Sequence, residues 1–160
     1  MSVTDDEFRG ALSLWPSGVS VVTAAVGADM HGMTVSSFCS VSLRPPLVSV
    51  CLASEARTLE LARRARAFGV SILSEPQASV SDHFAAAEED SERLQVGSFR
   101  LAENGCPLLE GAVAHLACDW FAEHEAGDHH LLIGHVVHAR CYGGAPLVYC
   151  SRRYGVFKPL

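Results

Sequence analysis

The sequence contains a single lysine, Lys158, and its other eleven basic side chains are arginines. With 12 basic and 18 acidic residues, the 160-residue chain carries a formal net charge of −6 at pH 7. Binding to nucleic acid irrespective of sequence depends on neutralising backbone phosphates, and the chain has no long basic run for that purpose. We therefore expect no nucleic-acid partner.

Long apolar runs are also missing. No stretch approaches the roughly 20 apolar residues that cross a bilayer. The acidic N-terminus, residues 1–7, lacks the basic and then apolar pattern of a secretory signal. Six cysteines are scattered without a C-x-x-C pair, so we expect reduced thiols that are mostly buried in strands. These absences favour a cytoplasmic protein with no membrane partner.

The short motifs typical of metal, nucleophile and phosphate sites are absent too. There is no H-E-x-x-H or Cys/His zinc spacing, no G-x-S-x-G elbow, and no Walker A or Rossmann glycine fingerprint. Of the eight histidines, the clearest pair is His135 and His138. These two are three residues apart on a predicted strand and point to opposite faces. We therefore expect no metal site and no acid–base catalytic pair.

Much of the sequence consists of apolar and β-branched segments, and these predict β-strands. With 49% hydrophobic and 19% charged residues, the chain can bury a substantial core. The predicted strands cover residues 19–26, 33–38, 41–43, 47–52, 68–73, 112–121, 130–141 and 147–150. Most neighbours are joined by turns, such as 27–32, rather than by helices, which disfavours a doubly wound parallel sheet. A single domain over 1–160, mainly β with flanking helices and forming an antiparallel barrel, fits best.

Three helices are predicted from capping patterns. Residues 4–7 have capping-box spacing before a helix with its apolar side chains on one face. Thr58 is a plausible N-cap for a helix over 58–66. Residues 74–77 combine a second capping box with an early proline and open a helix to about residue 87. Residues 88–105 are expected to form a long surface connection.

A segment rich in threonine and serine, residues 31–48, invites two interpretations. Taken alone, it is an exposed β face. The hydroxyls and backbone amides of Thr34, Ser36 and Ser37 also suit a polar, planar ligand that carries a phosphate. The loop at 53–58, which leads to a helix N-terminus, offers an anion site through free N–H groups and the helix dipole.

Together with other motifs, these segments resemble the short-chain flavin reductases, the reductase components of two-component flavin-dependent monooxygenases. The resemblance runs from about residue 8 to 157. Its motifs are 31–48, 51–58, 68–73, 81–85, Gly127-Asp-His129 with Gly134 and Val136, and 152–154. It implies an FMN-binding split β-barrel that forms a homodimer, with flavin near the subunit interface. It further implies that NADH, or alternatively NADPH, reduces FMN or FAD by hydride transfer and that a partner monooxygenase receives the reduced flavin.

The resemblance also assigns site residues by position. The flavin ring and ribityl chain would lie along Met33, Thr34, Val35, Ser36 and Ser37. The phosphate side would be approached by Cys51, Ala53, Ser54 and Thr58, and a helix would border the flavin through Ser81 and Phe84. His129 and Tyr154 would lie on the nicotinamide side. Many relatives carry a basic residue where this chain has Ser54, and Arg57 lies close enough in sequence to supply that charge.

Two other functions share the same barrel. One is a non-catalytic flavin-binding or flavin-carrying protein. The other is a split-barrel oxidase of the pyridoxamine-phosphate oxidase type, which would need a substrate-phosphate site that the sequence does not show. Arg152 and Arg153 are interpreted as surface charges, with contact to a nucleotide phosphate as the alternative.

Overall fold

The computed structural model describes residues 2–86 and 96–160. Its helices and strands in chain order are α1 (Asp5–Ser13), β1 (Ser17–Gly18), β2 (Ser20–Val26), β3 (Asp29–Val35), β4 (Cys39–Leu43), β5 (Pro46–Ala53), α2 (Arg57–Ala65), β6 (Ala67–Ile72), the 3-10 turn η1 (Glu75–Gln77), α3 (Ala78–Ala85), β7 (Phe99–Leu101), β8 (Pro107–Leu109), β9 (Ala114–Ala126), β10 (His129–Cys141), β11 (Leu147–Cys150) and β12 (Arg153–Val156).

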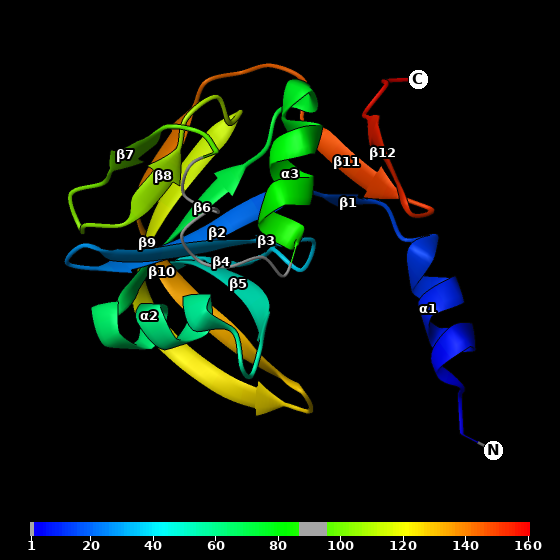
Figure 1. Cartoon of the computed structure of the whole chain (residues 1–160), viewed down its shortest axis with the longest axis horizontal. Coiled ribbons are helices and arrows are strands. Elements are labelled where there is room, and N and C mark those ends of the chain that lie inside the picture. The colour runs from blue at the N-terminus through cyan, green and yellow to red at the C-terminus, as the bar shows by residue number, and fades with distance from the viewer. Residues whose placement is uncertain (1, 87–95) are drawn as a thin grey trace.

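Seven of these strands form one sheet in the order β3-β2-β6-β9-β10-β5-β4, and every neighbouring pair is antiparallel (Figure 1). A three-stranded sheet, β1-β11-β12, and a two-stranded sheet, β7-β8, are added to it. The sequence-based expectation of a mainly β fold with antiparallel sheets and flanking helices is confirmed.

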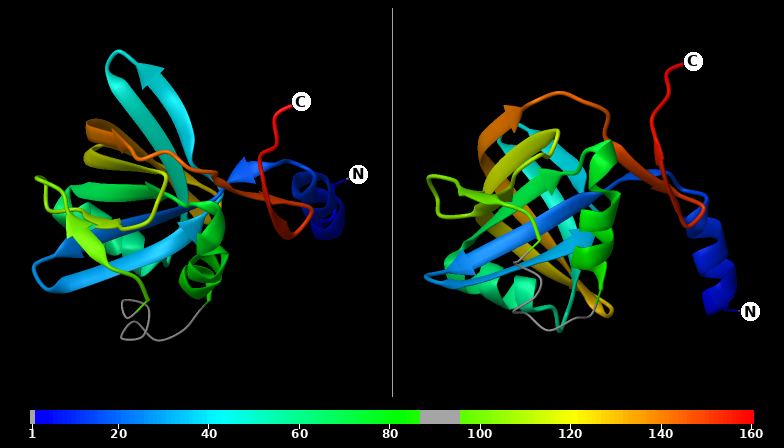
Figure 2. Two further views of the ribbon diagram at one scale, coloured as in Figure 1. Left: turned by 90° about the horizontal axis from the view of Figure 1, so that it is seen from above. Right: turned by 45° about the horizontal axis from the view of Figure 1, so that its top comes forward.

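The first strand of the large sheet lies near its other end. Although β3 and β5 lie near opposite ends of the strand order, they are in contact. Directly after β3, the Ser37 hydroxyl accepts a hydrogen bond from the Cys51 N–H at 3.0 Å and donates one to the Cys51 carbonyl at 3.1 Å. Figure 2 shows the resulting curvature of the sheet.

The main core fills the interior of this curved sheet. Leu59, Leu61 and Ala62 of α2 pack with Phe68 of β6 and Leu132 of β10, all of them nearly or fully buried. Gly134 of β10 allows the Phe68 ring to approach its backbone. A Cβ atom at position 134 would lie 2.5 Å from Phe68 Cζ and 2.7 Å from Cys118 Cβ.

Several predicted boundaries are corrected by the structure. The turn expected over 27–32 is only two residues long, because Gly27 adopts a left-handed φ of 62° and β3 starts at Asp29. The strand predicted over 33–38 starts earlier than expected and ends at Val35. Within the expected connection 88–105, residues 99–101 form β7, while 87–95 lie outside the described residues.

The expectation of mostly buried cysteines is wrong. All six are unpaired, but only Cys106 and Cys118 are buried, and Cys39 and Cys141 are exposed. The exposed pair lies on β4 and at the end of β10, where the strands extend beyond the packed interior.

Helix α1 has the predicted capping box between Thr4 and Glu7, yet none of its residues is buried. It projects from the rest of the chain beside β12 (Figures 1 and 2). Phe8 is 58% exposed and Trp15, just beyond the helix, is 74% exposed. Among the described helices, none combines the length and the apolar character needed to cross a membrane.

We predict that Gly134→Ala lowers the free energy of unfolding by about 1–3 kcal/mol, because the added methyl group overpacks the contact with Phe68 and Cys118. Gly10→Ala is the control, since nothing lies within 4 Å of a Cβ there and alanine favours the helix. Urea denaturation measures both variants. Equal stability of Gly134→Ala and the unmodified protein would contradict the packing described for Gly134.

Candidate functional site

Three cavities adjoin one another: one between β3, α3 and the β11–β12 hairpin, one between β3, α3 and the loop before α2, and one between α1 and the β11–β12 hairpin. The first, about 400 Å³, is lined by Val19, Thr34, Val35, Ser36, Ser81, Asp82, Ala85, Tyr149, Arg152, Arg153 and Tyr154. The second, about 360 Å³, is lined by His31, Met33, Thr34, Glu55, Ala56, Arg57, Phe84 and Ala85. The third, about 530 Å³, is lined by Arg9, Leu12, Ser13, Trp15, Ser17, Ser36, Tyr149 and Arg152. Shared residues join the first cavity to each of the others.

The structure gathers many of the sequence-predicted site residues on this surface. The first two cavities are lined by Met33, Thr34, Val35, Ser36, Ser81, Phe84 and Tyr154. The remaining predicted residues line neither cavity. Of these, Ser37 and Ser54 lie on loops, Cys51 and Ala53 on β5, Thr58 in α2, and His129 at the start of β10.

A set of hydrogen bonds orders the polar wall of the first cavity. The Thr34 hydroxyl donates to the Ser81 carbonyl at 2.7 Å, which joins β3 to α3. The Tyr154 hydroxyl donates to Asp82 Oδ1 at 2.7 Å and lies 2.9 Å from Ser81 Oγ. Burial, with the nearby Asp82 carboxylate adding to it, raises the pKa of Tyr154, so its hydroxyl stays protonated and able to donate at neutral pH.

The loop before α2 differs from its prediction at one residue. The helix starts at Arg57 with Ala56 as N-cap, so Thr58 is not the cap. Thr58 instead lies fully buried inside the helix, with its hydroxyl 2.6 Å from His31 Nδ1. Thr58 lies on the face of α2 that packs against the core, so its hydroxyl finds its partner on β3. Arg57 pairs with Asp29 at 2.7 Å and lines the second cavity.

The β9–β10 hairpin places His129 beside this loop. His129 pairs with Ala53 across the β5–β10 ladder, and the Ser54 N–H donates to the Asp128 carbonyl at 3.0 Å. The exposed His129 Nδ1 lies 2.7 Å from Asp128 Oδ1, and this contact lowers the pKa of Asp128. Tyr154 lies on β12, against α3. The two predicted nicotinamide residues therefore stand at different parts of the surface within one chain.

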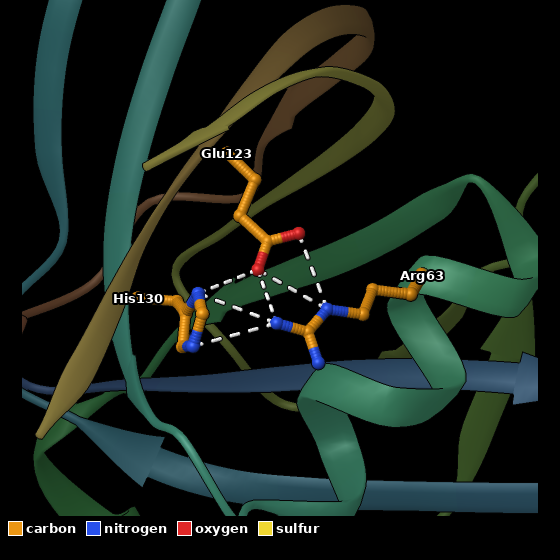
Figure 3. A network of polar contacts seen from close by, with 3 residues as sticks. All are labelled: Arg63, Glu123 and His130. Carbon is orange, nitrogen blue, oxygen red and sulfur yellow. Dashed lines mark hydrogen bonds and ion pairs between the residues drawn. The ribbon is translucent and has the colours of Figure 1, made fainter. Parts of the chain in front are cut away.

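A charged network that the sequence did not reveal joins this hairpin to α2. Arg63 donates from Nε and one terminal nitrogen to the Glu123 carboxylate, and His130 Nδ1 lies 2.6 Å from Glu123 Oε1 (Figure 3). Arg63 also lowers the pKa of Glu123, chiefly through these hydrogen bonds. His130 directly follows His129, so the network fixes the strand that carries the candidate nicotinamide contact.

The turn between β11 and β12 was also not predicted from the sequence. Cys150 pairs with Arg153, which leaves Ser151 and Arg152 as a two-residue turn, with φ of 52° and 60°. Left-handed backbone costs a residue with a side chain about 1–2 kcal/mol relative to the right-handed form. This turn presents Arg152 to the first and third cavities.

Comparison with known proteins places this geometry in a family. Residues 12–158 match the flavin reductase like domain. The chain is 43% identical to an NADH-dependent flavin reductase of a Rhodococcus species, over 99% of this chain and 88% of that protein. It is 37% identical to the reductase component of a 4-hydroxyphenylacetate 3-monooxygenase of Thermus thermophilus, over 93% of this chain and 94% of that protein. An NADH:FAD oxidoreductase of Streptomyces globisporus, solved with NAD and FAD fragments, superimposes with a TM-score of 0.90 at 33% identity, covering 99% of this chain and 98% of that one.

We predict that Glu123→Gln lowers the free energy of unfolding at pH 7 by about 0.5–1 kcal/mol, a modest loss because Arg63 is partly exposed. The lowered pKa of Glu123 means that its carboxylate stabilises the fold above the unfolded-state pKa of about 4.3, and that this contribution is lost as the pH falls through the lower folded-state value.

The stability difference between the unmodified protein and Glu123→Gln should therefore shrink below about pH 4. Denaturant unfolding at pH 7 and pH 3.5 measures it. Glu125→Gln, on the same strand and without an ion pair in the described part of the chain, is the control. A difference that does not depend on pH would show that the charge of Glu123 contributes nothing.

Proposed function

The chain belongs to the flavin reductase-like domain family, and we propose that it is an NADH-dependent flavin reductase that supplies reduced flavin to a separate monooxygenase. The observation that carries this proposal is the gathering of Met33, Thr34, Val35, Ser36, Ser81 and Phe84 on two adjoining cavities. The Rhodococcus relative is named for the NADH-dependent activity, and the Thermus relative for its place in a two-component monooxygenase.

The lining of the first two cavities fits a flavin. Their volumes of about 400 and 360 Å³ lie within the range of small-molecule sites, roughly 300–1,000 Å³. Apolar walls from Val35 and Phe84 suit a flat aromatic ring, and the hydroxyls of Thr34 and Ser36 suit its polar rim. Either FMN or FAD carries this ring, and both are proposed as substrates.

The bound nucleotides supply the redox chemistry, in which a hydride passes from dihydronicotinamide to flavin and leaves NAD⁺ and reduced flavin. The chain has to hold the two rings in contact, because this transfer needs close and correctly oriented partners. Residues 36–38 follow β3 outside the strand ladder, and their backbone N–H groups are suited to stabilise negative charge that develops on the flavin. No general base is needed, in keeping with the absence of an acid–base pair from the sequence motifs.

The finer architecture is part of the same proposal. The contact of β3 with β5, together with the two Ser37–Cys51 hydrogen bonds, supports a split β-barrel. The unburied apolar side chains of α1 support a homodimer in which a second copy covers them and borders the cavities. Six cysteines without disulfides fit a reducing cytoplasm.

The direct test is an anaerobic assay with purified protein, NADH and either FMN or FAD. We expect the NADH absorbance at 340 nm and the flavin absorbance near 450 nm to fall together at equal molar rates, because one hydride reduces one flavin. Replacing NADH with NADPH tests the choice of nucleotide. Binding of flavin without reduction by either nucleotide would leave a flavin carrier as the function.

We predict that His129→Ala lowers kcat/KM for NADH by roughly 2- to 13-fold, the loss expected for one hydrogen bond of about 0.5–1.5 kcal/mol. The flavin dissociation constant should stay unchanged. Steady-state kinetics at saturating flavin and fluorescence titration of the flavin measure the two quantities. His124→Ala, an exposed histidine on the same hairpin, is the control. Weaker flavin binding with normal NADH kinetics would assign His129 to the flavin instead.

A further inference from the structure

The turn at Ser151 and Arg152 breaks a local rule of protein structure. A two-residue hairpin turn with positive φ at both positions favours asparagine followed by glycine, yet this chain has serine followed by arginine. Backbone that is unfavourable for its residue is concentrated at functional sites, where the side chain is needed in that place. Arg152 is therefore a candidate for a binding role.

Two more arginines share its surroundings. Arg153 lines the first cavity with Arg152, and Arg9 lines the third. None of these three forms an ion pair within the described residues, as is also true of Arg44, Arg66 and Arg140, whereas Arg57, Arg63, Arg64 and Arg100 each pair with a carboxylate. What distinguishes Arg9, Arg152 and Arg153 is that they line two joined cavities.

The acidic groups at these cavities do not cancel that charge. Asp82 is the one carboxylate among the residues that line the first and third cavities, and it accepts the hydrogen bond of Tyr154. Guanidinium groups bind phosphate oxygens through paired, charge-assisted hydrogen bonds. The arginine-lined region therefore suits a ligand with more than one phosphate charge.

Aromatic side chains adjoin the same arginines. Tyr149 lines both the first and the third cavity, and Trp15 lines the third. Trp15 is the most exposed aromatic side chain in the described part of the chain, at 74%. Exposed rings beside arginines are typical of sites where a nucleotide base stacks and its phosphates are bound close by.

We propose that Arg9, Arg152 and Arg153 bind the diphosphate of an adenosine diphosphate group, with its adenine against Tyr149 and Trp15. This inference rests on the proposed function, because NADH and FAD both carry that group. The flavin phosphate is proposed at the loop 53–58, whose residues Glu55 to Arg57 line the second cavity rather than the third. The part of the first and third cavities that these arginines line is therefore assigned to NADH. In this assignment Arg152 and Arg153 bind the ligand and are not simply surface charges.

The test compares Arg152→Gly with Ser151→Gly. Glycine removes the guanidinium of Arg152 and also suits the left-handed φ of that position, so the variant keeps its fold. Ser151→Gly relieves the neighbouring residue in the same way and retains the arginine. Thermal unfolding of both variants checks that neither is destabilised.

Isothermal titration with ADP, and with adenosine as the uncharged probe, measures the site without turnover. We expect Arg152→Gly to raise the dissociation constant for ADP about 10-fold, the effect of losing one charge-assisted phosphate contact, and to leave that for adenosine unchanged. Ser151→Gly should bind both as the unmodified protein does. Salt should weaken ADP binding less in Arg152→Gly than in the unmodified protein.

Kinetics and flavin titration then distinguish the two sources of the group. A KM for NADH raised about 10-fold at unchanged kcat assigns the site to NADH, whereas weaker binding of FAD but not of FMN assigns it to FAD. Unchanged ADP binding in Arg152→Gly, or an equal loss of FMN and FAD affinity, overturns the inference. A protein that binds ADP through Arg152 but transfers no hydride would instead contradict the proposed function alone.

Discussion

The site depends on one side chain that joins the segment after β3, the first strand of the large sheet, to β5 near its other end. The Ser37 hydroxyl both accepts from and donates to the backbone of Cys51, so the segment that leaves β3 is attached to β5 as a further strand would be. In the strand order, β3 and β5 are separated by four strands, and this junction links them directly. The polar residues at the end of β3 and the loop that follows β5 are thereby held near each other. The Ser37 hydroxyl is used by the protein's own backbone, so Ser37 holds this surface together.

Helix α2 connects the two halves of the site because it is held at both ends. Near its N-terminus, Thr58 contacts His31 of β3, and near its C-terminus Arg63 binds Glu123 beside His130. The contact between Thr58 and His31 is buried. Breaking it would lower the free energy of unfolding by about 1–3 kcal/mol, because a polar group would be left buried without a partner. The second contact is partly exposed and weaker, and it acts mainly on geometry. The loop 53–56 and the hairpin that carries His129 are thus attached to the same rigid helix.

The surface beyond the first cavity carries basic side chains without carboxylate partners in the described part of the chain. Elsewhere, four arginines of the described residues pair with carboxylates, as in Arg57–Asp29 and Arg100–Glu110. At the β11–β12 turn, Arg152 and Arg153 line cavities together with hydroxyl and aromatic side chains and one carboxylate, that of Asp82. Helix α1, with its apolar side chains unburied, lies beside this region. An apolar cover from a second copy and a charged ligand would therefore act on neighbouring parts of one surface.

The sequence by itself determined the features that depend on neighbouring residues. Alternation and β-branching identified the strands around residues 19–26, 47–52 and 68–73, and side-chain spacing identified the capping boxes at Thr4 and Ser74. The order of its motifs also indicated the flavin reductase family.

Only the tertiary structure decided which side chains meet across the fold. Thr58 looked like a helix cap and became a buried partner of His31, 27 positions away, while Arg63 meets Glu123 at a separation of 60. Such contacts depend on how the sheet curves and where α2 packs, and no local periodicity carries that information. The left-handed backbone at Arg152 could not be predicted from local sequence either. The pairing of β11 with β12 requires a turn with positive φ, and serine and arginine do not favour that turn.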